Sequence, residues 1–343
     1  MSAPLLIMGA PGSPYTRKML ALLRYRRLPH EFIVRGSARH RALPKPRVEL
    51  LPTFYLPDAN GTLEAHTDST PLLRRFEGEF AGRAARPRDP AIAFLDSLLE
   101  DYADEWLTKP MFHYRWHYAA DAEKASRILP RWRNLTGPEE AARADTAAFA
   151  ARQIGRLRYV GSSTATAGVI EDSYVRFLEA LTAHFEALPF LMGGRPGASD
   201  FGIYGQLTQL AHFDPTPQAL TLERAPRVYA WVGVVDDLSG LEPREDDWIA
   251  RDAIPPTLLG LLREVGRTYV PVMLANARAV RDNAAAVEAT VEGKPWTQNP
   301  FPYQAKCLKW LREEFAALAD ADRKRVDGVL EATGCAPLIH ATP

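Results

Sequence analysis

The stretch "PLLIMGAPGSPYTRKMLALL", residues 4–23, decides the fold of the first part of the chain. Its opening "PLLIMG" is a short apolar run typical of a buried strand. The rest is amphipathic, with Met19, Leu22 and Leu23 on one face. Ser13 can cap such a helix, and Pro14 suits its first turn. The stretch therefore predicts a strand that leads through a short loop into a helix.

The segments that follow complete a β-α-β then β-β-α order. "HEFIVR" (30–35) predicts a second strand, and "PTFYLPDANGTLEAH" (52–66) predicts a hairpin with its turn at Asp58 to Gly61. "TDSTPLLRRFEGEF" (67–80) predicts another helix, opened by Ser or Thr with an early proline. Strands and helices in this order predict an α/β domain.

The chain changes character after residues 81–90, "AGRAARPRDP", whose composition is typical of a linker. Apolar residues then recur at steps of three and four, which predicts a mainly helical second half. The first such series consists of Ile92, Leu95, Leu98, Leu99, Tyr102 and Trp106. Residues 255–293 are expected to form long helical segments, and residues 300–334 an amphipathic helical pair.

Composition excludes several classes of protein. The 343 residues carry 42 basic and 42 acidic side chains, so no overall field favours nucleic acid or an anionic membrane surface. No window approaches the roughly 18 apolar residues of a membrane span. The N-terminus lacks the positive flank of a signal peptide, and only two cysteines are present, so we expect a cytoplasmic protein. His113 and His117 lack a metal-binding frame, and no metal site is predicted.

Three short motifs, taken in this order, resemble those of the glutathione transferase superfamily. "GSPYT" (12–16) resembles the loop after the first strand in serine-type and omega-like members. "LLPTF" (50–54) resembles the step before the third strand, and "HTDST" (66–70) resembles the acidic-Ser step that opens the third helix. "PFLMGGRPGASDFGIYGQL" (189–207) resembles a later helix start, although the family usually has Ser or Thr where this chain has Gly197.

The resemblance implies a thioredoxin-like N-terminal domain with a mixed four-stranded sheet, followed by an all-α domain. It implies a glutathione-binding domain at residues 1–82, a linker at 83–90 and a transferase-type helical domain at 91–244. Residues 245–343 exceed the usual length of the family and are predicted to be a helical extension packed on the α domain. The resemblance also implies a homodimer.

The resemblance implies glutathione as co-substrate, bound as a thiolate. Ser13 falls where the family places the residue that contacts the sulfur, and a hydroxyl at a helix N-terminus stabilises a thiolate. Pro52 would be cis, and Leu51 would offer its backbone to the cysteinyl unit. Asp68 and Ser69 would hold the γ-glutamyl group. The glycine carboxylate needs a cation, for which the candidates are Lys45 and His40.

A small hydrophobic electrophile would complete the reaction. The candidates for its pocket are Tyr15, Tyr102, Trp106 and Tyr114, although aromatic residues at helical spacing also serve as core. The absence of cysteine at Ser13 speaks against a glutathionyl-transfer activity. The sequence thus predicts a glutathione S-transferase, and the alternative is a noncatalytic scaffold or protein-interaction module of the same fold.

Overall fold

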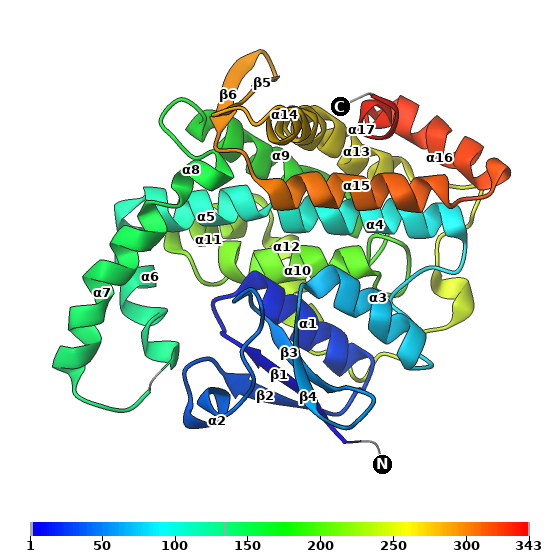
Figure 1. The fold of residues 1–343 in the computed structure, drawn as a ribbon. Coiled ribbons are helices and arrows are strands. Elements are labelled where there is room, and N and C mark those ends of the chain that lie inside the picture. Colours follow the sequence, from blue (N-terminus) through cyan, green and yellow to red (C-terminus); the bar gives the residue numbers. More distant parts are fainter. Residues whose placement is uncertain (1–2, 134, 342–343) are drawn as a thin grey trace.

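The N-terminal part of the chain forms a four-stranded mixed sheet (Figure 1). The structure is a computed structural model, which describes residues 3–133 and 135–341. The strands are β1 (Leu5–Gly9), β2 (His30–Val34), β3 (Thr53–Pro57) and β4 (Leu63–Thr67), in the order β2-β1-β3-β4. β1 pairs parallel with β2 and antiparallel with β3, and β3 pairs antiparallel with β4. The predicted thioredoxin-like fold class is confirmed.

The helices of this part are α1 (Pro14–Tyr25), the short α2 (Ala38–Arg41) and α3 (Ser69–Glu79). α1 and α3 begin where the sequence predicts them, whereas α2 was not predicted. The Ser13 Oγ accepts a hydrogen bond of 3.3 Å from the Thr16 N–H, which caps α1. Met19, Leu22 and Leu23 are fully buried, so the apolar face of α1 joins the core as its spacing predicts.

The rest of the chain is largely helical and covers α1 and α3 from one side, as Figure 1 shows. α6 and α7 extend away from the body of the molecule as an arm (Figure 1). Among the described residues, no helix has the length and apolar character needed to cross a lipid bilayer. The elements up to residue 247 are α4 (Pro90–Glu105), α5 (Thr108–His117), α6 (Ala119–Ile128), η1 (Arg131–Arg133), α7 (Glu139–Ile154), α8 (Leu157–Val160), α9 (Ala167–Phe185), α10 (Ala198–Leu210), α11 (Pro215–Arg224), α12 (Pro226–Val235) and η2 (Glu245–Asp247).

The start of α10 explains why the chain has glycine at position 197. A Cβ on Gly197 would lie 2.3 Å from Asp96 Oδ1 of α4, so only glycine leaves room for that carboxylate. Asp96 accepts hydrogen bonds from the Ala198 and Ser199 N–H groups, each 3.1 Å long, and from the Ser199 hydroxyl. The start of α10 thus relies on a carboxylate from a neighbouring helix, together with Asp200 of α10, which accepts from the Gly197 N–H at 2.8 Å.

α10 also packs closely on α1. A Cβ on Gly205 would lie 2.5 Å from the Pro14 carbonyl oxygen, so this glycine allows the two helix backbones to approach each other. The first turn of α1, which carries Ser13 at its cap, therefore rests directly on the helical part of the molecule.

The C-terminal hundred residues pack on the same helices. Their elements are α13 (Pro256–Glu264), η3 (Val265–Tyr269), α14 (Val270–Arg281), β5 (Val287–Val291), β6 (Lys294–Gln298), α15 (Pro302–Ala316), α16 (Asp320–Thr333) and α17 (Ala336–His340). α15 runs alongside α4, and α16 also contacts α4 (Figure 1).

One part of this region differs from the prediction. Residues 287–298 form a two-stranded hairpin, where the sequence was expected to remain helical up to residue 293. Val287, Thr290 and Val291 are β-branched and favour a strand. Glu292 and Gly293 have positive φ angles of 52° and 74°, which is the geometry of a tight hairpin turn.

Candidate functional site

The sheet brings the three predicted motifs to one edge. Met8, near the end of β1, pairs with Thr53, the first residue of β3, and Thr53 in turn pairs with Thr67, the last residue of β4. The loop that follows β1, the residues that precede β3 and those that follow β4 therefore meet at the same end of the sheet. Segments separated by up to about sixty residues in sequence become neighbours in this way.

Ser13 lies in the loop at this edge and is 9% exposed. Its oxygen accepts the capping hydrogen bond from Thr16, whereas its own hydrogen has no acceptor among the described residues. A serine hydroxyl has one donor and two acceptor lone pairs, so capping leaves the donor unused. The capping role and the proposed contact with sulfur are therefore compatible.

Tyr15 and Thr16, in the first turn of α1, both have structural contacts. Thr16 is fully buried, and its hydroxyl oxygen accepts a hydrogen bond of 3.4 Å from the Ala10 N–H, which fixes the loop. The Tyr15 hydroxyl donates to the Asp104 carbonyl oxygen at 2.9 Å. Burial is the main cause that raises the pKa of Tyr15 well above its ordinary value, so this phenol stays neutral.

The second motif places its backbone toward the same edge. The Leu51–Pro52 peptide bond is cis, as the sequence predicts. The backbone N–H and C=O of Leu51 form no hydrogen bonds with the described residues. Both groups are thus unused and able to pair with an extended peptide ligand.

The third motif forms the start of α3. Asp68 has φ +85°, which is uncommon for a residue other than glycine and recurs at functional sites. Its carboxylate makes no capping hydrogen bond to α3. Burial raises the pKa of Asp68, and contacts with Tyr303 and Lys306 partly offset that rise. Ser69 is 7% exposed, and its hydroxyl has no hydrogen-bond partner in the part of the chain that the structure describes.

The two candidate cations lie on the segment between β2 and β3. His40 is half-buried, and its Nδ1 accepts from the Gly36 N–H at 3.1 Å. Burial, followed by the charge of Arg35, lowers the pKa of His40, so the ring is neutral at neutral pH. Lys45 is exposed and pairs with no other described residue. Lys45 is therefore the better candidate for a carboxylate, and the role of either residue stays a prediction.

A buried ionic cluster holds α1, α3 and α4 together beneath this edge. Lys18 Nζ lies 2.7 Å from Glu100 Oε1, 2.5 Å from Asp104 Oδ2 and 3.3 Å from the Thr70 hydroxyl. Arg74 of α3 also contacts Glu100, at 2.7 Å. Burial disfavours the charged form of Glu100, but the charges of Arg74 and Lys18 outweigh it and lower its pKa to about 2. The cluster thus fixes the helix start that carries Ser69.

The aromatic residues predicted to form a substrate pocket lie deep in the structure. Tyr102, Trp106 and Tyr114 are each at most 3% exposed, and Trp106 Nε1 donates to the Ser173 hydroxyl at 3.2 Å. None of them lines either of the two cavities described among the placed residues. A substrate could reach them only if the surrounding helices moved, so they have no part in the function proposed below. Tyr15 is half-buried and borders the same loop as Ser13.

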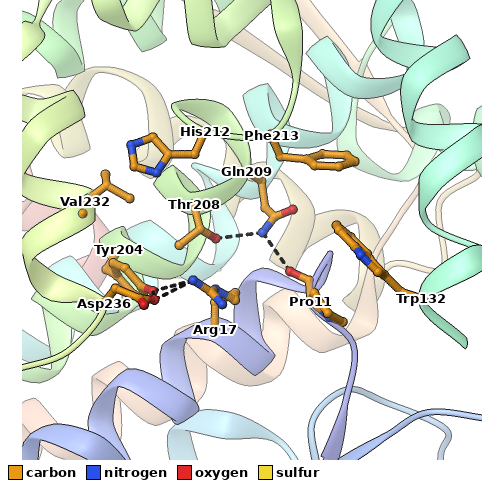
Figure 2. A pocket seen from close by; sticks show the side chains of 11 residues that line it. Pro11, Arg17, Trp132, Tyr204, Thr208, Gln209, His212, Phe213, Val232 and Asp236 are labelled. Carbon is orange, nitrogen blue, oxygen red and sulfur yellow. Dashed lines mark hydrogen bonds and ion pairs between the residues drawn. The ribbon is translucent and has the colours of Figure 1, made fainter. Parts of the chain in front are cut away.

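A cavity of about 380 Å³ borders the loop between β1 and α1 on the side of α10 and α12 (Figure 2). Pro11 and Trp132 line one side, and Phe213 packs on Trp132 with ring centroids 5.2 Å apart. Arg17 and Asp236 face each other on the other side (Figure 2). The pocket therefore combines aromatic walls with one ion pair, next to the loop that holds Ser13.

Two residues at the edge of the sheet escaped the sequence analysis. Tyr303 and Lys306 of α15 contact Asp68, although 235 positions separate Asp68 from Tyr303. No local pattern joins segments so far apart, and only a proposed docking of the extension on α3 could have pointed to them.

The fold and the arrangement of this edge define a protein with a thioredoxin-like domain followed by a helical domain. The family model described as glutathione S-transferase, N-terminal domain, matches residues 7–84, and that of the C-terminal domain matches residues 139–233. The two matched ranges together span half of the chain. The protein belongs to the glutathione S-transferase superfamily.

Solved structures with a similar fold include members of this superfamily. A glutathione S-transferase from Rhodospirillum rubrum F11 is 16% identical, with 75% of this chain and 91% of that chain covered and a TM-score of 0.42. A GST-like protein from Pseudomonas syringae is 17% identical, with 68% and 67% covered and a TM-score of 0.41. A glutathione S-transferase from Methylobacterium radiotolerans JCM 2831, in complex with glutathione sulfonate, is 16% identical, with 68% and 91% covered and a TM-score of 0.40. No curated protein matches the chain.

Proposed function

We propose that this protein is a glutathione transferase that activates the thiol of bound glutathione for attack on a small hydrophobic electrophile. The convergence of Ser13, Leu51 and Ser69 at one edge of the sheet carries this proposal. Each of them offers hydrogen-bonding capacity that the described residues leave unused: the Ser13 hydroxyl donor, the Leu51 backbone N–H and C=O, and the Ser69 hydroxyl. A tripeptide laid along this edge would use all three.

The chemistry asked of Ser13 is modest. The glutathione thiol has an ordinary pKa near that of free cysteine, about 8.5, so it is mostly protonated at neutral pH. The Ser13 hydroxyl and the positive end of α1 both favour the thiolate. A shift of one or two pKa units, about 1.4 kcal/mol each, is enough to make the thiolate a large fraction at pH 7. The thiolate then attacks the electrophile and displaces its leaving group.

The electrophile is placed in the cavity beside Pro11. Trp132 and Phe213 offer apolar surface there, and Pro11 is two residues from Ser13 along the loop. This cavity replaces the pocket expected at Tyr102, Trp106 and Tyr114, whose side chains are buried in the core.

Two measurements test the proposal: retention on immobilised glutathione, and turnover of a generic aryl halide. We expect the wild-type chain to be retained and to turn over the halide. Ser13→Ala should lower kcat/KM by up to about 8- to 25-fold near pH 7, which is the change in thiolate fraction when the pKa of the thiol returns to about 8.5 from one or two units below it. Tyr15→Phe should have much less effect, because its hydroxyl is committed to Asp104.

Ser13→Asp separates capping from catalysis. An aspartate caps a helix about as well as a serine, but its carboxylate cannot donate to a thiolate and would repel it. We expect this variant to keep its stability and lose activity. If the wild type is retained on immobilised glutathione but does not turn over the halide, the result would instead favour the noncatalytic scaffold. Absence of both retention and a thermal shift with millimolar glutathione would rule out the proposed function.

A further inference from the structure

The helix α15, which belongs to the C-terminal hundred residues, reaches the start of α3. The Tyr303 hydroxyl donates to Asp68 Oδ1 at 2.8 Å, and Lys306 Nζ lies 3.9 Å from Asp68 Oδ2. The Asp68 side chain is 14% exposed, so the helix holds this carboxylate in place without sealing it from solvent. The residue with the unusual backbone conformation is thus fixed by a distant part of the chain.

Two polar groups next to Asp68, the Ser69 hydroxyl and the start of α3, have no side-chain hydrogen-bond partner among the described residues. The Ser69 residue is 7% exposed, and its hydroxyl has no partner among the described residues. The Ser69 oxygen is not among the fully buried side-chain atoms that lack a partner, so this hydroxyl is open to a ligand or to water. Asp68 provides no cap for α3, which leaves the positive end of this helix available to an anion.

Lys306 supplies a cation at the same place. Its side chain is 53% exposed, and its ammonium lies 4.2 Å from the centroid of the Trp310 ring and 5.7 Å from that of Tyr303. These rings favour one placement of a side chain that is otherwise flexible. The site therefore combines one carboxylate, one ammonium, a hydroxyl and a helix N-terminus.

We propose that α15 completes the binding site for the α-amino acid head group of the γ-glutamyl unit. A zwitterionic head group carries one ammonium and one carboxylate. Asp68 would bind the ammonium, while Lys306, the Ser69 hydroxyl and the start of α3 would bind the carboxylate. Tyr303 is a positioning residue, which orients Asp68 through its hydrogen bond. The inference rests on the proposed function and makes the C-terminal region a part of the glutathione site.

The test compares the KM for glutathione in Lys306→Ala with that of the wild type. Loss of a charge-assisted contact should raise KM about tenfold, with kcat little changed. Lys309→Ala is the matched control, because Lys309 is one turn further along α15, 73% exposed and paired with Glu313 rather than with Asp68. Tyr303→Phe should raise KM about threefold, since it keeps the ring and removes only the orienting hydrogen bond.

Cysteinylglycine lacks the γ-glutamyl unit, so it shows whether the rise in KM depends on that unit. With this thiol, Lys306→Ala and the wild type should have the same KM. An unchanged or lower KM for glutathione in Lys306→Ala would overturn the inference; the lower value would mean that α15 obstructs the site. An equal loss with both thiols would also overturn it. If the wild type binds no glutathione at all, the proposed function fails first, and the inference fails with it.

Discussion

Arg17 and Lys18 are neighbours on α1, and each forms ion pairs in a different environment. The Arg17 and Asp236 side chains are 28% and 44% exposed, lie 2.6 Å apart and line the cavity. Lys18 and Glu100 are each 1% exposed and lie 2.7 Å apart between three helices. Solvent screens the first pair, whereas protein groups surround the second. Because a charge left alone in the interior is costly, we expect that removal of one partner destabilises the protein more at the buried pair than at the exposed pair.

The largest expected loss of stability comes from removing Lys18 from the buried cluster. Lys18→Met would leave Asp104 without its cation and Glu100 with Arg74 alone. Removing one partner of a buried ion pair costs about 3–5 kcal/mol, because the other charge stays buried. Chemical denaturation at pH 7 should show a loss of this size. A loss below about 1 kcal/mol would mean that water reaches the cluster.

A smaller loss of stability is expected when acid protonates Glu100 in the same cluster. The folded pKa of Glu100 is about 2, below its ordinary 4.5, so its stabilising contribution is complete above pH 4.5 and is lost as pH falls toward 2. Between pH 4.5 and pH 3 this loss amounts to about 2 kcal/mol. Glu100→Gln removes the titrating group, so its free energy of unfolding should fall less over this interval. Equal slopes for the wild type and the variant would contradict the assignment.

Protonation of Asp104 changes stability in the opposite direction, so its contribution must be distinguished from that of Glu100. Burial is the main cause that raises its pKa to about 6. A raised carboxyl pKa means that the folded state binds the proton more tightly, so stability increases as pH falls from about 6 to its ordinary value of 3.8. The measurements for Glu100 therefore begin at pH 4.5, where most of the Asp104 effect is complete.

The smallest loss of stability is expected from removing Arg17 from the exposed ion pair. Arg17→Met removes an ion pair that is screened by water, and such pairs contribute less than about 1 kcal/mol. Raising the salt concentration should reduce the difference between this variant and the wild type. A loss as large as that of Lys18→Met would show that the Arg17 contact with the Tyr204 hydroxyl, or that with Asp236, is worth far more than its exposure indicates.

Local pattern was sufficient to predict the N-terminal sheet from the sequence. Each predicted strand and helix up to residue 80 has its own periodicity, its cap or its turn, and these signals require no knowledge of distant residues. The four-residue α2 was not predicted. Ser13, Leu51 and Ser69 were named as candidates because their motifs resemble those of the glutathione transferase superfamily. Their chemical roles remain predictions.

Features that depend on contacts between distant segments could not be predicted. Tyr303 meets Asp68 only because α15 packs along α4, and nothing near either residue encodes that packing. The hairpin at residues 287–298 was missed for a different reason. "AAAVEATV" contains alanine and glutamate, which favour helix, and the pairing with residues 294–298 decides the outcome.

The replacement at Gly197 has a consequence for the order in which the molecule assembles. A side chain on the helix itself would cap α10 through a local contact, whereas Asp96 does so across 102 positions of the chain. Asp200 of α10 accepts locally from the Gly197 N–H at 2.8 Å. The contact with Asp96 costs chain entropy to close, so the Ala198 and Ser199 N–H groups gain their acceptor only when α4 has docked. α10 packs through Gly205 against the Pro14 carbonyl, so the loop with Ser13 rests on a helix whose start depends on α4. This end of the sheet is thus supported by contacts between distant segments as well as by its own sequence.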